Sequence, residues 1–207
     1  MIDELQDFIT TLRRFRPTAN EKRYFIVMVI GVLMNQLLFS LVCLFNLPIW
    51  LDVSGTALVA FLLEPTAGLI VGLINNFYLS IFVYGSNSLL YYSISAAVAL
   101  LVGIRLRGKD GKFLPRRIPS TMALVFIVST LLATLLTLWR SGGIPTGNWE
   151  TMFYQYALGW RFPNVLACMF GTAVVKFFDT IAVTGVVALF YLLLPAKLKY
   201  PPKGLSL

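Results

Sequence analysis

The chain contains several uninterrupted apolar runs of the length needed to cross a lipid bilayer. A helix that crosses a hydrocarbon core of about 30 Å needs about 20 predominantly apolar residues. Four segments reach that standard, and a fifth is slightly shorter but carries no charge. The four are 24–46, 66–84, 119–139 and 166–194, and the fifth is 88–104. These segments predict an all-α integral membrane protein.

The composition agrees with that fold class. Of the 207 residues, 58% are hydrophobic and 13% are charged. The net charge is +8 without any histidine, but the basic residues sit in short stretches between the apolar runs. That distribution indicates membrane orientation, so we expect a lipid bilayer and no nucleic acid as the surroundings of the chain.

Residues 49–63 form a sixth apolar stretch, and its length alone does not decide whether it crosses the membrane. Cytoplasmic loops hold an excess of Lys and Arg, and the two strongest basic clusters lie at 13–23 and 105–117. Counting 49–63 as a crossing puts four spans between these clusters and places both on the same side. We therefore predict that 49–63 is a short or partly re-entrant second span of a six-helix bundle with both termini in the cytoplasm.

This topology gives three parts. Residues 1–23 are predicted to be a cytoplasmic N-terminal segment, 24–195 a single six-helix membrane domain, and 196–207 a cytoplasmic tail. Apolar residues at helical spacing in the first segment, from Leu5 to Phe15, fit a helix on the inner membrane surface. A plain solvated arm remains an alternative.

The predicted outer loops are rich in aromatic residues. Loops 47–52 and 140–164 contain Trp50, Trp149, Tyr154, Tyr156 and Trp160. Such residues form an interfacial belt in many membrane proteins. They also suit a lid over an outward-facing pocket, because irregular backbone near the membrane needs protein or water around it. Both interpretations stay open.

Polar side chains inside the predicted spans carry most of the functional signal, because ionisable groups are costly there. Lys176 and Asp179 are three residues apart and share a helix face, either as a self-neutralising pair or as ligand-binding groups. Asn75 and Asn76 lie in the third span, and Asn35 and Gln36 lie in the first. Such amides join helices by hydrogen bonds or line a common polar cavity.

Two shorter features concern the helix ends and the helix packing. Asp52 precedes Ser54-Gly55-Thr56, so it is predicted to cap the second span and is also a candidate for the rim of a pocket. Pro65 is expected to begin the third span after a turn at Glu64. The spacing of Gly68 and Gly72 predicts close helix packing and, less specifically, a docking face for another membrane subunit.

Two stretches together resemble a known family. Residues 47–57 read LPIWLDVSGTA and residues 61–76 read FLLEPTAGLIVGLINN. They resemble the substrate-binding S components of energy-coupling factor (ECF) vitamin transporters, in which an "LP-x-x-x-D-x-x-G-T-A" start precedes a "G-P-x-x-G-x-x-x-G-x-x-x-N" third helix. Glu64 stands where those members tend to have Gly. The last span from Lys176 to Pro195 also resembles the closing helix of that family.

The resemblance implies a monomeric protein of the prokaryotic plasma membrane that captures a vitamin-like small molecule from outside. Release would follow association with a membrane coupling subunit and two cytoplasmic ATPases, and the chain itself has no P-loop. Family members dock through small residues on the first helix. The nearest match here is the imperfect Gly31-x-x-x-Asn35, which adds Gly31 and Asn35 to the docking candidates.

An enzyme is a poorer fit, because Cys43 and Cys168 are isolated and the carboxylates of the spans are scattered. We predict no catalytic residue, no metal and no cofactor. A sensory input module that works with a separate signalling partner is the alternative function. The predicted substrate-binding residues are Trp50, Asp52, Asn75, Asn76, Trp160, Lys176 and Asp179.

Overall fold

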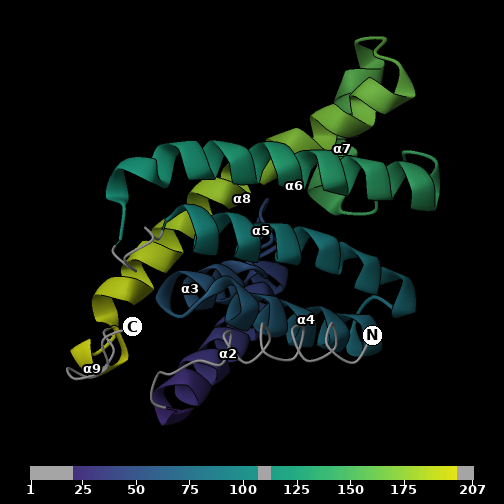
Figure 1. The fold of residues 1–207 in the computed structure, drawn as a ribbon. Helices are drawn as coiled ribbons and strands as arrows, with labels where there is room; N and C mark the ends of the chain where they lie inside the picture. The colour runs from purple at the N-terminus through teal and green to yellow at the C-terminus, as the bar shows by residue number, and fades with distance from the viewer. Residues whose placement is uncertain (1–20, 107–112, 200–207) are drawn as a thin grey trace, which may run out of the picture.

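The computed structural model describes residues 21–106 and 113–199, and this part of the chain is built from helices joined by short loops (Figure 1). The long helices are α2 (Glu21–Phe45), α4 (Pro65–Phe82), α5 (Tyr92–Arg105), α6 (Ile118–Ser141) and α8 (Asn164–Leu193). The shorter helices are α3 (Ser54–Leu62), η1 (Ser86–Tyr91), η2 (Pro115–Arg117), α7 (Asn148–Gly159) and α9 (Ala196–Lys199).

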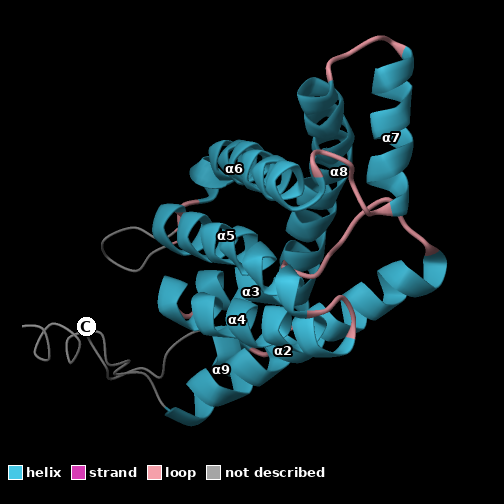
Figure 2. Cartoon of the chain, turned by 90° about the vertical axis from the view of Figure 1, so that its right-hand side faces the viewer, coloured by secondary structure: helices cyan, strands magenta, loops and turns pink. Residues whose placement is uncertain are grey.

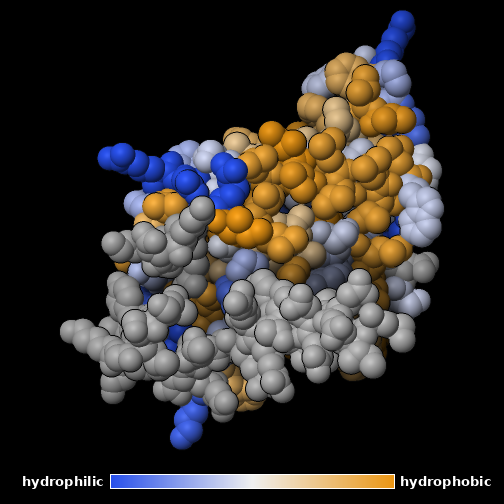
Figure 3. Space-filling view, viewed as in Figure 1, coloured by the Kyte–Doolittle hydropathy of each residue, from blue (hydrophilic) through white to orange (hydrophobic). Residues whose placement is uncertain are grey.

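Five helices are long and apolar enough to cross a membrane, which confirms the five long spans predicted from the sequence. They are Lys22–Phe45, Pro65–Phe82, Ser88–Arg105, Pro115–Ser141 and Asn164–Leu193. Their outward faces expose large apolar side chains, with Phe25 70% exposed and Leu192 72% exposed. On the face that Figure 3 shows, apolar residues, in orange, cover most of the described surface. Soluble proteins rarely expose apolar surface on this scale, so these faces are suited to lipid.

Helix α3 occupies the centre of the bundle. Eight of its nine residues are buried, and it packs against α2, α4, α5 and α8. Nine helical residues rise only about 14 Å, which is about half of a bilayer core. The predicted second span 49–63 is therefore a half-length helix that follows an irregular segment, rather than a full-length transmembrane helix.

The segment 46–63 nevertheless carries the chain from one end of the bundle to the other. Asn46 follows the last residue of α2, while Leu62 lies beside the first turn of α2, where the Arg23 side chain donates to the Leu62 carbonyl at 3.4 Å. Arg23 also donates to the Leu198 carbonyl at 2.9 Å. The beginning of α2, the end of α3 and the chain after α8 therefore meet at one end of the bundle.

We call this end the basic end. Arg105 at the end of α5 donates to Ser120 near the start of α6 at 3.2 Å, so these helix termini meet there as well. The described basic residues at this end are Lys22, Arg23, Arg105, Arg116, Arg117, Lys197 and Lys199. At the opposite end, the Asn164 side chain of α8 donates to the Gly142 carbonyl after α6 at 2.7 Å. We call this the pocket end.

Glycines allow α3 to fit between its neighbours. A Cβ on Gly55 would lie 1.9 Å from the Gly31 carbonyl oxygen of α2. A Cβ on Gly68 would lie 2.6 Å from the Ala60 side chain, and one on Gly72 would lie 3.1 Å from Ser95. Asn35 is fully buried. The four predicted docking residues, Gly31, Asn35, Gly68 and Gly72, thus face the interior of the bundle, which corrects their assignment to a partner surface.

The segment 140–164, predicted as an outer loop, contains helix α7, which lies against the first half of α8 (Figure 2). Tyr154 and Ala157 of α7 are buried against Ala167 and Cys168 of α8. Close contact is possible because Gly171 has no side chain, since a Cβ there would lie 2.5 Å from the Glu150 carbonyl oxygen. This packing fixes the start of α7 beside the pocket end.

Candidate functional site

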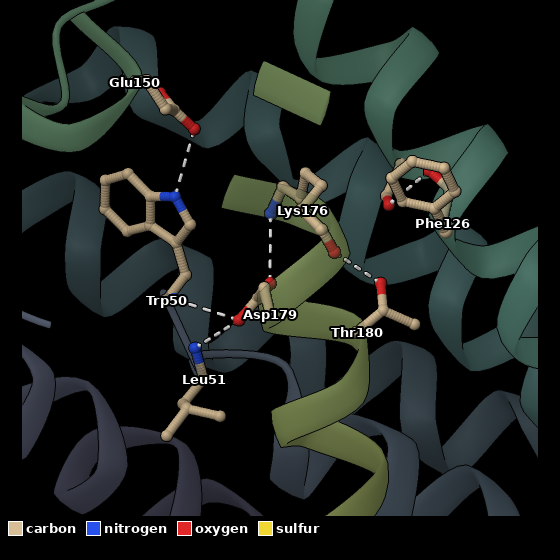
Figure 4. Close-up of polar contacts among 8 residues, drawn as sticks. Trp50, Leu51, Phe126, Glu150, Lys176, Asp179 and Thr180 are labelled. Atoms are coloured by element: carbon tan, nitrogen blue, oxygen red, sulfur yellow. Dashed lines mark hydrogen bonds and ion pairs between the residues drawn. The ribbon is translucent and has the colours of Figure 1, made fainter. Parts of the chain in front are cut away.

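Asp179 anchors the irregular segment before α3. Its Oδ1 accepts hydrogen bonds from the backbone N–H of Trp50 at 3.0 Å and of Leu51 at 2.9 Å (Figure 4). Asp179 lies near the middle of α8, so these N–H groups sit deep in the bundle. Backbone groups at such depth need partners within the protein. The carboxylate of Asp179 therefore holds the segment in place.

The backbone of Leu51 takes an unusual conformation at this anchor. Its φ is 55°, in the left-handed region, which costs roughly 1–2 kcal/mol for a residue with a Cβ. Its side chain is buried, and its N–H is one of the two held by Asp179. The conformation turns the chain sharply between Trp50 and Asp52.

Lys176 pairs with the other oxygen of the same carboxylate. Its Nζ lies 3.4 Å from Asp179 Oδ2, longer than the roughly 2.7–2.9 Å typical of charge-assisted hydrogen bonds. An ammonium group has three N–H donors, and this is the one hydrogen bond of Lys176 Nζ within the described ranges. The predicted ion pair is present, and Lys176 retains donors for another acceptor.

A pocket at the pocket end reaches down to Lys176. Its volume is about 110 Å³, on the scale of the roughly 150 Å³ cavity that accepts a benzene ring. Helices α4, α5, α6, α7 and α8, η1 and the segment before α3 all contribute to its wall. The lining residues include Trp50, Asp52, Asn76, Tyr84, Tyr91, Arg140, Glu150 and Lys176. A second cavity, which is lined mostly by apolar side chains, continues past Lys176 between α5, α6 and α8.

Glu150 closes one side of the pocket. It lies in the first turn of α7, and its Oε1 accepts a hydrogen bond from the indole Nε1 of Trp50 at 3.2 Å. Figure 4 shows Trp50 between Asp179 and Glu150, with the Lys176 side chain beside them. Burial raises the pKa of the Glu150 carboxyl, while the nearby Lys176 opposes that rise. The pocket thus disfavours the charged form of this group.

Asp52 lines the pocket and does not cap α3. The residue at the N-cap position of α3 is Val53, and no side chain caps that helix, so the predicted capping role is wrong. The backbone carbonyl of Asp52 accepts a hydrogen bond from Asn75 Nδ2 at 3.0 Å. That bond positions Asp52, whose carboxylate forms part of the pocket wall.

The four amides were predicted either to join helices or to line a common cavity, and each forms a hydrogen bond between helices while Asn76 also lines the pocket. Asn76 reaches the pocket, and its Nδ2 donates to Ser95 Oγ at 2.7 Å and to the Gly72 carbonyl at 2.8 Å. Asn75 joins α4 to α2, since its Oδ1 accepts a hydrogen bond from Gln36 Nε2 at 2.6 Å. Asn35 likewise joins α2 to α3 through Thr56 at 3.0 Å.

Trp160 lies apart from this group. It follows α7 at the turn into α8, where it is 62% exposed, and its ring packs against Phe162 and Phe170 at centroid distances of 6.2 and 5.7 Å. It is absent from the wall of the pocket. The turn between α7 and α8 directs this residue away from the segment before α3, so the structure does not bring it to the other candidates.

The aromatic and charged pocket residues that sequence reasoning missed are Tyr84, Tyr91, Arg140 and Glu150. Glu150 could have been predicted from the sequence, because it is the one acidic residue of the aromatic-rich segment 140–164 and directly follows Trp149. Among the described residues, no group of three His, Cys, Asp or Glu side chains is arranged to hold a metal ion. No protein-family model, curated protein or solved structure matches this chain.

Proposed function

We propose that this chain is a membrane-embedded capture subunit that takes a vitamin-like small molecule from outside the cell. The observation that carries the proposal is the pocket of mixed aromatic and charged lining that descends from the pocket end to Lys176. Ligand sites combine apolar walls with a few polar groups that fix orientation. The resemblance of residues 47–76 to ECF S components supports the same function.

The proposed orientation places the pocket end outside. The described Lys and Arg residues at the basic end are Lys22, Arg23, Arg105, Arg116, Arg117, Lys197 and Lys199, against Arg140 and Arg161 at the pocket end. Positively charged ends face the cytoplasm. The half-helix α3 and the segment before it then act as a sixth pass, so that both termini lie in the cytoplasm.

Uptake in this proposal requires partners. Energy for release would come from a membrane coupling subunit with two cytoplasmic ATPases, as the resemblance to ECF S components implies. The proposed docking surface excludes Gly31, Asn35, Gly68 and Gly72, because these residues are buried inside the bundle. Entry and release from the pocket would involve movement of the segment that Asp179 anchors.

The test is to purify the protein in detergent without added ligand, release copurifying small molecules by denaturation, and identify them by mass spectrometry. A single small compound at near-equal stoichiometry, reduced at least about tenfold in Glu150→Gln, supports capture. Glu64→Gln is the matched control, because Glu64 lies at the basic end, where its carboxylate accepts from Thr66. An empty protein that also binds no member of a vitamin panel favours the sensory alternative.

A further inference from the structure

We propose that the ligand of this pocket carries a compact cationic group, such as a primary amine, seated between Asp52 and Glu150. The inference rests on the proposed capture function and adds the chemical class of the substrate. The proposed cationic class follows from the charged groups around Lys176 and from the aromatic residues in the pocket wall.

Three acidic groups lie around Lys176, the buried basic group of the pocket. The described ranges contain five Asp and Glu residues, Glu21, Asp52, Glu64, Glu150 and Asp179, and three of these surround Lys176. Asp179 is already satisfied, because one oxygen holds two backbone N–H groups and the other pairs with Lys176. Asp52 and Glu150 are the acidic groups left facing the cavity.

Within the described residues, neither of these carboxylates forms a direct ion pair, and Lys176 attracts both of them only from a longer distance. No Lys or Arg nitrogen of the described residues lies within 4.0 Å of either one. Arg140 lines the same pocket, but its side chain is exposed and lies at the end of α6, toward the mouth. Buried charges are normally paired, and burial raises the pKa of the Glu150 carboxyl although Lys176 lies nearby. A ligand cation would supply a direct partner.

The aromatic wall favours the same class of ligand. Trp50, Tyr84 and Tyr91 line the cavity, and the faces of such rings attract ammonium groups, most strongly where water is excluded. An anionic group at this depth would instead meet Asp52 and Glu150. The unused N–H donors of Lys176 suit a neutral acceptor, such as a hydroxyl or carbonyl oxygen, beside the cationic group.

Three probes of similar shape and different charge test the inference. Benzylamine is cationic at neutral pH, benzyl alcohol is neutral and phenylacetate is anionic, and each carries one ring, the size that the cavity accommodates. Binding to the ligand-stripped protein in detergent is measured by quenching of tryptophan fluorescence and by the shift of thermal unfolding, for the wild type, Asp52→Asn, Glu150→Gln and the control Glu64→Gln.

The expected result is that benzylamine binds at least about tenfold more tightly than the other two probes, and that Asp52→Asn and Glu150→Gln each remove most of that preference. Glu64→Gln should retain it. Thermal unfolding of each variant without probe checks that the fold is intact. If one of the two neutral variants does not fold, the other one carries the test. Asp52→Glu, which keeps the charge, should retain the preference for benzylamine.

Two other results are informative and distinguishable. If benzyl alcohol or phenylacetate binds as well as benzylamine, or if the copurifying compound has no basic nitrogen, the cationic class is overturned while capture stands. If none of the probes binds and no compound copurifies, the capture function itself fails.

Discussion

At the scale of single residues, Asp179 does more than neutralise a buried lysine. One of its oxygens accepts two backbone N–H groups from the segment before α3, and the other pairs with Lys176. The same carboxylate therefore satisfies backbone that no regular helix covers and fixes the residues on either side of Leu51. Trp50 and Asp52 reach the pocket because Leu51 is held in its left-handed conformation between them.

Replacing Asp179 by alanine should strongly destabilise the protein. Two buried N–H groups lose their acceptor, at about 1–3 kcal/mol each, and Lys176 loses its partner. Asp179→Asn keeps an oxygen acceptor for the two N–H groups, so its loss of stability should be distinctly smaller. Thermal unfolding in detergent, followed by circular dichroism, separates the two variants. Equal losses for both would show that the charge, and not the backbone anchor, is what matters.

The Glu150 carboxyl should make stability depend on pH. Burial raises its pKa above the ordinary value of 4.5, so the group favours the folded state most below pH 4.5, and that contribution is lost as the pH rises through the raised value. The groups around it are Trp50, Asp52, Arg140, Lys176 and Asp179, with Tyr84 in the same wall.

Glu150→Gln removes this titration and keeps an acceptor for Trp50. The unfolding temperature of the wild type relative to Glu150→Gln should therefore fall as the pH rises from 4.5 through the raised pKa. Differential scanning fluorimetry of both proteins across this range makes the measurement. A constant difference would mean that Glu150 is not the titrating group.

At the scale of elements, the packing of α7 on α8 decides where Glu150 stands. Gly171 lies directly under the first turns of α7, so the absence of a side chain sets the distance between the two helices. Trp149 also holds the start of α7 in position, because its indole N–H donates a hydrogen bond to the carbonyl of Asn46, after the end of α2, at 2.9 Å. The start of α7 is thus fixed against both α8 and the end of α2.

Gly171→Ala should displace α7. The new Cβ would meet the Glu150 carbonyl oxygen at 2.5 Å and the Tyr154 nitrogen at 3.0 Å, both of them backbone atoms. We expect a loss of about 1–3 kcal/mol and weaker ligand binding.

Gly185→Ala is the matched control on the same helix, because nothing lies within 4 Å of its Cβ position. It should be neutral or stabilise by up to about 1 kcal/mol through helix propensity. Unfolding temperatures and the amount of copurifying ligand compare the two variants. If Gly185→Ala lowers stability as much as Gly171→Ala does, both changes act on helix α8 itself and not on the contact between α7 and α8.

At the scale of the whole molecule, the path of residues 46–63 determines the topology. This segment crosses the bundle with one half-length helix and an irregular stretch, which protein surrounds and Asp179 anchors. Irregular backbone at membrane depth is tolerated only under such conditions. The described chain therefore begins and ends at the same end of the bundle.

Single-cysteine labelling tests this topology. In a background of Cys43→Ser and Cys168→Ser, a membrane-impermeant maleimide applied to intact cells should label Ser86→Cys at the pocket end. Thr18→Cys and Lys109→Cys lie outside the described residues and should react only after permeabilisation, because the proposed six-pass arrangement predicts a cytoplasmic position for both. Labelling of one of these two from outside would indicate that residues 46–63 do not cross.

Much of the framework was predictable from the sequence, because apolar length is a local property of the chain. The five long helices follow from their apolar runs, and Pro65 begins α4 as predicted. The pairing of Lys176 with Asp179 follows from their three-residue spacing on one helix. Each of these features depends on residues that are neighbours in the chain.

The pocket depended on contacts between distant segments. Asn75 and Asn76 are adjacent in sequence, yet Asn75 bonds to α2 while Asn76 bonds to α5 and lines the pocket, because successive residues of a helix face different directions. Glu150 reaches the pocket only through the close contact of α7 with Gly171. The tertiary structure also placed the small residues around α3 inside the bundle, because only glycines leave room for a half-length helix between α2 and α4.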